Sequence, residues 1–232
     1  MIDSFRHKGL RKKLVEKIRS RKGISEKVLS AIGAVPRHFF MDSTFLDFAY
    51  EDNAFPIAAG QTISQPYTVA FQTELLDVEK GDKILEIGTG SGYQACVLIE
   101  MGAKVFSIER QKVLFNKGKE FLPSINYNPK LFYGDGYKGL PTFAPFDKVL
   151  ITAGADSIPQ TLIDQLKIGG VLVAPVGQRD VQIMTKIVKT SETDYEKSKH
   201  GTFRFVPLLK DIARDWWFPY GPIRANFVSL AL

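Results

Sequence analysis

Short apolar runs in the middle of the chain are separated by stretches with helical spacing. The runs that we interpret as strands cover 83–87, 105–108, 130–133, 148–152 and 171–175. Helices are expected between them, over about 93–101, 111–121 and 159–166. Strands that alternate with helices of this length are typical of a parallel sheet. The pattern therefore predicts an α/β fold, with a doubly wound, mainly parallel sheet and helices on both faces.

The N-terminal region, residues 1–78, is expected to add helices and loops to this core. Apolar side chains recur at every fourth position from Leu10 to Ile18, which is typical of an amphipathic helix with one buried face. A second helix should end near Val35, because the residue before a proline is pushed out of the helical conformation. A third helix is expected over 69–76.

The pattern changes towards the C-terminus. Apolar and polar residues alternate over 181–189 and again over 202–208, on either side of a polar loop at 190–201. This period of two predicts antiparallel strands. We therefore expect a core over 79–210 that ends in antiparallel strands, and then an extension over 211–232, all within one structural domain.

The composition is that of a globular protein. The chain has 232 residues, of which 44% are hydrophobic and 24% charged, and it is long enough to bury a core without disulfides. Cys96 is the single cysteine, so no intrachain disulfide can form and a cytoplasmic location is expected. Three histidines, far apart in the sequence, argue against a zinc site, and no metal is expected. No apolar run approaches the roughly 20 residues of a membrane span.

The net charge of +6 is concentrated at the N-terminus. Residues 1–22 hold nine Lys and Arg against Asp3 and Glu16, a balance of +7, so the remainder of the chain carries −1. A nucleic-acid or membrane partner would have to rest on this segment alone. Aromatic residues that could stack on bases are not interleaved with the charges. We interpret the segment as the solvated face of a helix and expect neither partner.

Three glycines fall where the first strand should meet the following helix. Gly88, Gly90 and Gly92 have the spacing G-x-G-x-G, and Glu86 lies two residues ahead. A dinucleotide site has the spacing G-x-G-x-x-G instead. Glycine allows positive φ and close approach of a ligand, and open α/β sheets bind ligands at the carboxyl ends of their strands. The string therefore predicts a ligand site there.

Two acidic residues at later strand ends narrow the choice of ligand. Glu109 ends the second strand, 21 residues after Gly88, where a carboxylate can accept from both hydroxyls of a ribose. Asp135, between Gly134 and Gly136, follows the third strand and is placed to accept from an adenine amino group. Taken singly, Glu109 could be a helix N-terminal acid and Asp135 a turn residue. Taken together, they predict a cofactor that contains adenosine.

The same positions resemble a known family. The string from Glu86 to Gly92, followed by Glu109 and Asp135, resembles the S-adenosylmethionine-binding core of class I methyltransferases. The string Gly-Gln-Thr-Ile-Ser-Gln-Pro-Tyr at 60–67 resembles the signature of protein-L-isoaspartate O-methyltransferases. Further similar pieces, within residues 10–209, lie at 35–37, 52–56, 144–147, 169–177 and 204–208.

The resemblance implies a Rossmann-like class I fold and a repair enzyme. Its reaction would transfer a methyl group from S-adenosylmethionine to the α-carboxylate of L-isoaspartyl residues in damaged proteins and peptides, leaving S-adenosylhomocysteine. The ester would then collapse to a succinimide, which initiates repair. The attacking carboxylate is already ionised near pH 7, so the reaction requires no general base and no metal. The enzyme mainly has to align the two groups and exclude water.

On the substrate side, the resemblance assigns Ser64 to orienting the substrate carboxylate. Thr62 and Ile63 would lie beside it, near the cofactor. Without the resemblance, this stretch would be interpreted as an ordinary turn ahead of Pro66.

On the cofactor side, the resemblance assigns Glu109 to the ribose and Asp135 with Gly136 to the adenine edge. Glu86 would either brace the glycine turn or hold the cofactor amine. The methionine end would lie against the glycine turn, formed by Gly88, Thr89, Gly90, Ser91 and Gly92.

Two alternatives stay open on the sequence alone. One is a different S-adenosylmethionine-dependent methyltransferase, acting on a small molecule or a nucleic acid. The other is a catalytically idle protein that keeps the cofactor site and contacts partners through its extension.

The extension at 211–232 departs from the family pattern. It is rich in aromatic residues, whereas disordered tails are poor in them. It is therefore expected to pack on its own domain or to support self-association through a second copy. The aromatic residues are Trp216, Trp217, Phe218, Tyr220 and Phe227.

Overall fold

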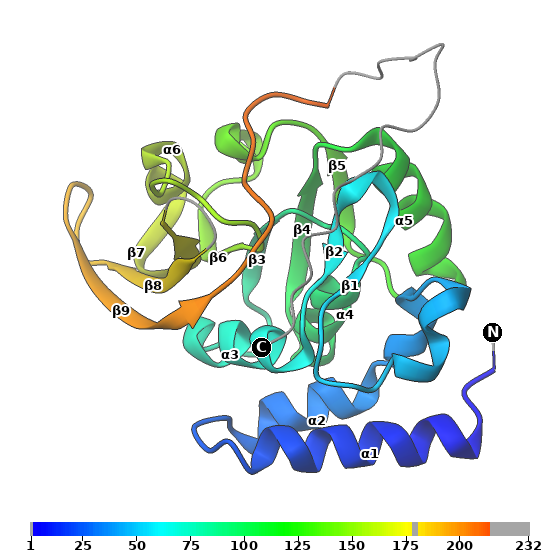
Figure 1. Cartoon of the computed structure of the whole chain (residues 1–232). Helices are drawn as coiled ribbons and strands as arrows, with labels where there is room; N and C mark the ends of the chain where they lie inside the picture. The colour runs from blue at the N-terminus through cyan, green and yellow to red at the C-terminus, as the bar shows by residue number, and fades with distance from the viewer. Residues whose placement is uncertain (1, 178–180, 214–232) are drawn as a thin grey trace.

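A seven-stranded mixed sheet forms the centre of the computed structural model, which describes residues 2–177 and 181–213 (Figure 1). The strand order is β5-β4-β3-β6-β7-β8-β9. Strands β3 to β7 pair in parallel, and β8 and β9 join antiparallel. The strands are β3 (Lys83–Ile87), β4 (Lys104–Glu109), β5 (Lys130–Tyr133), β6 (Phe146–Ile151), β7 (Leu166–Val176), β8 (Gln182–Lys189) and β9 (Tyr195–Phe203). The predicted doubly wound sheet is confirmed.

The chain reverses its direction of travel across the sheet beside β3. From β3 it moves to β4 and β5 on one side, and it then returns to β6 on the other side of β3. Open α/β sheets bind ligands outside the carboxyl ends of the strands at such a reversal. The fold therefore points to the loops that follow β3, β4 and β6.

Helices cover both faces of the sheet, because successive strand residues point to opposite sides. One face packs Ile84, Val105 and Leu150 against helices α3 (Pro66–Leu76) and α4 (Tyr93–Glu100), and α5 (Lys112–Ser124) lies beside α4. The other face packs against α6 (Gln160–Asp164) and the 3-10 turns η4 (Gly136–Lys138) and η5 (Pro141–Phe143).

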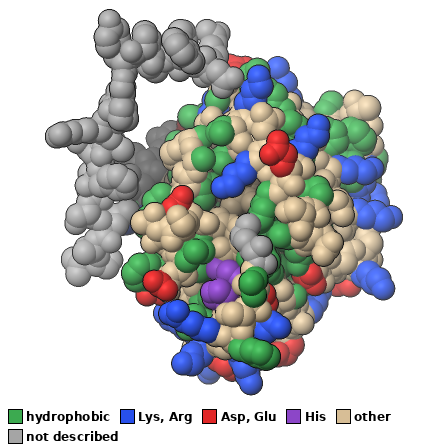
Figure 2. All heavy atoms as spheres, turned by 90° about the vertical axis from the view of Figure 1, so that its right-hand side faces the viewer, with side chains coloured by type: hydrophobic (Ala, Val, Ile, Leu, Met, Phe, Trp, Pro, Cys, Tyr) green, Lys and Arg blue, Asp and Glu red, His purple; other side chains and the backbone are tan. Residues whose placement is uncertain are grey.

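The N-terminal helices α1 (Phe5–Arg19) and α2 (Glu26–Ala34) pack below this first layer, against α3 and α4 (Figure 1). Leu14 and Ile18 are buried, as the amphipathic pattern predicted, and α2 ends at Ala34. The lysines of α1 are exposed. Figure 2 shows basic side chains interspersed with acidic ones on the lower part of the molecule. This arrangement fits a solvated helix surface.

A loop region connects α2 to α3 and carries the 60–67 string. It contains two short paired strands, which bring Phe55 opposite Ile63. Its elements are η1 (Arg37–Phe40), η2 (Ser43–Phe48), β1 (Phe55–Pro56), η3 (Ala58–Gly60) and β2 (Thr62–Ile63). The region was expected to be mainly loop, and it contains three 3-10 helices and two short strands.

The predicted position of the last strand is wrong. We expected a strand over 202–208 after a loop over 190–201, whereas β9 spans Tyr195–Phe203 and residues 204–208 form only an isolated bridge, from Pro207 to Gly154. The strand is at the edge of the sheet, and nearly all of its residues are exposed. An exposed edge strand does not need alternating apolar residues, so its sequence resembles a polar loop.

The start of the extension is described, and its remainder lies outside the described residues. The Arg110 side chain donates to the carbonyl of Asp211 at 3.0 Å, and the N–H of Ala213 donates to the carbonyl of Arg110 at 3.0 Å. Residues 211–213 therefore contact the loop after β4. The expected packing of Trp216, Trp217, Phe218, Tyr220 and Phe227 falls on residues 214–232, outside the described part.

No helix in the described part of the chain is long and apolar enough to cross a membrane.

Candidate active site

A cavity lies at the carboxyl ends of β3, β4 and β6, where the strand order reverses; we call it the glycine-turn cavity. Two loops distant in sequence close it, one around the 60–67 string and the other after β9. Nine of the predicted site residues line it: Thr62, Ile63, Ser64, Gly88, Thr89, Gly90, Ser91, Glu109 and Gly136. The fold therefore brings the two predicted groups, for cofactor and for substrate, to one cavity.

The glycine turn takes its shape from backbone conformations that glycine tolerates. Gly88, Gly90 and Gly92 have φ values of 99°, 55° and 86°. A Cβ on Gly88 would lie 2.6 Å from the hydroxyl oxygen of Thr152, and one on Gly92 would lie 2.8 Å from Leu122. A side chain at either position would be strained and would also collide with a neighbour. Gly92 does not line the cavity; it lets α4 begin directly against α5.

Glu109 lies at the edge of the cavity with both carboxylate oxygens engaged. One oxygen accepts from the N–H of Gly90 and the other from the N–H of Gln111, each at 2.8 Å. Burial raises the pKa of Glu109, and the two backbone donors oppose that shift. Each carboxylate oxygen can accept more than one hydrogen bond. Glu109 can therefore fix the glycine turn and still accept from a ligand hydroxyl.

Glu86 lies beneath the glycine turn, fully buried, and is not among the residues that line the cavity. The Ser107 hydroxyl donates to one of its oxygens, and the Thr89 and Ser107 hydroxyl oxygens are 2.6 Å apart. Its other oxygen has no hydrogen-bond partner within the described residues. Burial raises the pKa of Glu86 to about 8, so the carboxyl is mainly protonated at neutral pH. Of its two expected roles, this position favours bracing the turn.

Asp135 caps a short turn at the far side of the cavity. Its side chain accepts from the N–H of Tyr137 at 2.9 Å, and Gly136, next to it, lines the cavity. A Cβ on Gly136 would collide with Ile87, so glycine is required where the chain passes the end of β3. Asp135 is therefore a turn residue in this structure, which was one of its two expected roles. Its contact with an adenine stays a prediction.

Ser64 occupies the boundary between the glycine-turn cavity and a second cavity. Ser64 lines both cavities, and its hydroxyl has no hydrogen-bond partner within the described residues. Thr62, Thr152 and Val206 also line both cavities. An oxygen of a ligand can therefore accept from Ser64 at the place where the two cavities meet.

Buried charged groups hold the substrate-side loop in place. The carboxylate of Asp52 is 1% exposed, accepts from the N–H of Tyr67 at 2.8 Å and pairs with Arg21 at 2.7 Å. Arg37, fully buried, donates to the carbonyl of Asn53 at 3.2 Å. Burial lowers the pKa of Arg37 to about 10, so it remains charged at neutral pH. These contacts bind residues 52–53 to η1 on one side and to the start of α3 on the other.

Several cavity residues were missed by the sequence analysis. Gln72 and Gln94 belong to helices α3 and α4, and both are buried. Gln72 donates to the carbonyl of Ile151 at 3.0 Å, whereas the side-chain oxygen of Gln94 has no partner within the described residues. A glutamine on a mainly apolar helix face could have identified both residues. Glutamine is rarely buried without a polar partner, so such a position indicates a polar contact or a ligand site in the interior. Tyr93, Arg110, Thr152, Ala153 and Leu209 also line the cavity, as do Gln61 and 206–208, which lie in stretches that carried the family resemblance.

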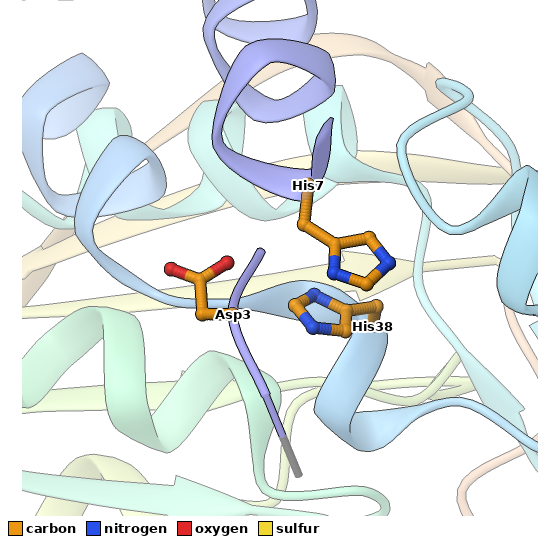
Figure 3. A group of neighbouring side chains, drawn as sticks. All are labelled: Asp3, His7 and His38. Carbon is orange, nitrogen blue, oxygen red and sulfur yellow. The ribbon is translucent and has the colours of Figure 1, made fainter. Parts of the chain in front are cut away.

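Two histidines that are distant in sequence meet in the N-terminal region, next to Asp3 (Figure 3). The rings of His7 and His38 are stacked, with centroids 3.8 Å apart and planes 24° apart. A metal ion lies in the ring plane of each ligating imidazole, about 2 Å from the nitrogen, and face-to-face rings share no such point. The Arg11 guanidinium donates a hydrogen bond to each carboxylate oxygen of Asp3. The Tyr50 hydroxyl is hydrogen-bonded to Nδ1 of His38. The geometry favours a structural cluster.

The fold and the cavity define an α/β enzyme of the class I methyltransferase type. The model of the protein-L-isoaspartate(D-aspartate) O-methyltransferase family matches residues 9–213. Two relatives named protein-L-isoaspartate O-methyltransferase are similar over 91% of this chain and 99% of their own. The one from Christiangramia forsetii is 58% identical, and the one from Flavobacterium johnsoniae is 59% identical. The chain belongs to this family.

Two solved structures support the same assignment. A protein-L-isoaspartate O-methyltransferase is 29% identical with a TM-score of 0.77, and the match covers 85% of this chain and 65% of that one. A Plasmodium falciparum protein described as an isoaspartate methyltransferase, in complex with S-adenosyl-L-homocysteine, is 26% identical with a TM-score of 0.74. That match covers 86% of this chain and 98% of the other.

The raised pKa of Glu86 predicts a pH-dependent stability. The unfolded chain releases the Glu86 proton near pH 4.5, whereas the folded protein keeps it up to about pH 8. Between these two values the folded state binds the extra proton, so the free energy of unfolding decreases as pH rises. Glu86→Gln, which cannot ionise, should raise the Tm by on the order of 10 °C at pH 8.5 and have little effect at pH 5. Thermal unfolding at both pH values tests this. Glu120→Gln, on the exposed face of α5, is the control; an equal effect of both variants would contradict the prediction.

Proposed function

We propose that the chain transfers the methyl group of S-adenosylmethionine to the α-carboxylate of L-isoaspartyl residues in damaged proteins and peptides. The amide nitrogen of the following residue then attacks the methyl ester, methanol leaves, and the succinimide that forms initiates repair. The observation that carries the proposal is the position of Ser64 at the boundary of two cavities, where its hydroxyl has no partner among the described residues. The family match over residues 9–213 favours this function over a different methyltransferase substrate or an idle binding protein.

The residues of the glycine-turn cavity fit the cofactor. Bound there, S-adenosylmethionine supplies an electrophilic methyl group on a sulfonium. Glu109 would accept from the ribose hydroxyls with its remaining lone pairs. The glycine turn would lie against the methionine end, since its backbone can approach a ligand closely. The turn at Asp135 and Gly136 would hold the adenine edge.

The chemical step needs alignment more than acid–base catalysis. A carboxylate oxygen of the substrate attacks the methyl carbon while the carbon–sulfur bond breaks, and the sulfur keeps the bonding electrons. No proton is transferred in this step, because the carboxylate is already ionised. Ser64 would donate to the carboxylate oxygen that does not react and thereby fix its orientation. Closure of the cavity by residues 206–209 would exclude water.

We also propose that the protein is located in the cytoplasm. Cys96 is the single cysteine and is buried, which fits a reducing compartment such as the cytoplasm.

Substitution of Ser64 tests the substrate side. Ser64→Ala should lower kcat on an isoaspartyl peptide by on the order of 100-fold, because a carboxylate held less precisely reaches the methyl group less often. Affinity for the cofactor, measured by calorimetry, should change little. Ser30→Ala, on the exposed face of α2, is the matched control. Methyl transfer to the normal aspartyl isomer at the same rate would contradict the proposed substrate.

Substitution of Glu109 tests the cofactor side. Glu109→Ala should weaken S-adenosylmethionine binding by roughly 10- to 150-fold, the range for a hydrogen bond to a charged group. Calorimetry on the folded variant measures this, with Glu120→Ala as the exposed control. Unchanged affinity would remove Glu109 from the ribose site, and tight binding of NAD by the wild type would overturn the choice of cofactor.

For the extension, we propose packing on its own domain or on a second copy. Its aromatic composition supports this, as do the contacts of residues 211–213 with Arg110. Deletion of residues 211–232 should lower the Tm or change the oligomeric state, since each buried aromatic side chain contributes about 1.5–3 kcal/mol. Unfolding and sedimentation measure these effects. A truncated chain that matches the full chain in both, and in activity, would show that the extension is dispensable.

A further inference from the structure

The second cavity forms a groove that begins at Ser64 and leads away from the glycine turn; we call it the substrate groove. Its volume is about 660 Å³. One wall comes from the 60–67 string and α3, and the other from the end of β9 and residues 204–206. A peptide whose reacting carboxylate lies at Ser64 would therefore place its neighbouring residues in this groove. The inference below rests on the proposed function, because it concerns the same substrate.

The charged side chains that line the substrate groove have one sign. Arg21 and Arg204 contribute to its lining, and within the described residues no Asp or Glu does. Neither arginine lines the glycine-turn cavity. The two guanidinium groups are therefore placed to contact a part of the substrate other than the carboxylate that is methylated.

Arg21 is oriented by its surroundings, and its charge is largely compensated. It pairs with the buried carboxylate of Asp52 at 2.7 Å. Its guanidinium also lies 4.3 Å from the centre of the Tyr67 ring, which is a cation–π distance. Arg21 therefore contributes a fixed hydrogen-bonding surface more than a free positive charge.

Arg204 has an uncompensated charge on a fixed piece of backbone. Its side chain is exposed and has no hydrogen-bond or ion-pair partner within residues 2–177 and 181–213. On its C-terminal side, the N–H of Phe205 donates to the Gln182 side chain at 2.9 Å. The carbonyl of Val206 accepts from the N–H of Gly154 at 2.8 Å. The guanidinium is thus attached to a rigid wall of the groove.

We propose that Arg204, which lines the same groove as Arg21, is a specificity-determining residue that favours isoaspartyl peptides with an acidic side chain near the isoaspartate. A guanidinium matches a carboxylate with two parallel hydrogen bonds, which neither an amide nor an ammonium group can reproduce. The absence of acidic side chains from the described lining removes competitors for the arginine. The long-range attraction also raises the encounter rate with acidic peptides.

The test compares isoaspartyl peptides that differ in one residue. Glu, Gln or Lys is placed at each of the two positions on either side of the isoaspartate, and kcat/KM is measured for each peptide. At one position at least, wild-type protein should prefer Glu to Gln by about 3- to 10-fold, as expected for a partly solvated charge pair. The preference should shrink in 0.5 M salt, because exposed charges are screened.

Variants of Arg204 separate its charge from general effects. Arg204→Gln should bring the ratio of kcat/KM for the Glu and Gln peptides close to one. Arg204→Glu should invert the preference, so that the Lys peptide becomes the better substrate. Lys199→Gln removes the same charge from the exposed face of β9 outside the groove, and it should leave the wild-type ratio intact.

The outcomes distinguish this inference from the proposed function. If wild-type protein methylates all three peptides equally well, or if Arg204→Gln keeps the wild-type ratio, the inference is wrong while the function stands. If wild-type protein methylates none of them, the proposed function fails, and the inference fails with it.

Discussion

The glycine turn after β3 is the constraint on which the site depends. The N–H groups of Gly88 and Thr89 both donate to the carbonyl of Ile108, and the N–H of Gly90 donates to Glu109. These bonds join the ends of β3 and β4 and fix the carboxylate that faces the cavity. The left-handed backbone of the turn also lets α4 begin against Leu122 of α5. One short segment thus sets the cavity floor, the position of Glu109 and the packing of the first helical layer.

The substrate side is held by a different kind of force. The loop between α2 and α3 packs Phe40 and Ile63 into the core, and the buried side chains of Asp52 and Arg37 fix residues 52–53 in addition. Asp52 pairs with Arg21 at 2.7 Å, and a buried charge without a partner is costly, so removal of Arg21 would leave the Asp52 carboxylate uncompensated. This gives the loop a defined position beside the glycine turn. Ser64 can then lie at the boundary of two cavities, and no hydrogen bond from the part of the chain that the structure describes holds its hydroxyl.

The electrostatics of the two cavities differ. Glu109 and Arg110 both line the glycine-turn cavity, and Glu86 beneath the turn is mainly protonated at neutral pH because burial raises its pKa to about 8. The substrate groove presents Arg21 and Arg204 instead. The charge of Arg204 would therefore favour an anionic peptide in the groove, and the carboxylate of Glu109 would be the acidic group that faces the cofactor, with the neutral hydroxyl of Ser64 between them. This arrangement suits a reaction in which a sulfonium and a carboxylate must meet.

The sequence by itself determined the parallel sheet core, the positions of its buried strands along the chain and the glycine turn. Buried strands must be apolar and turns with positive φ favour glycine, so local chemistry is enough to identify them. Only the tertiary structure placed the edge strand β9, whose exposed residues carry no apolar pattern. It also decided that Glu86 lies beneath the cavity, that His7 stacks on His38, and that Arg204 reaches the groove beside Ser64. Those relations join residues far apart in the chain, and packing of the whole fold sets them.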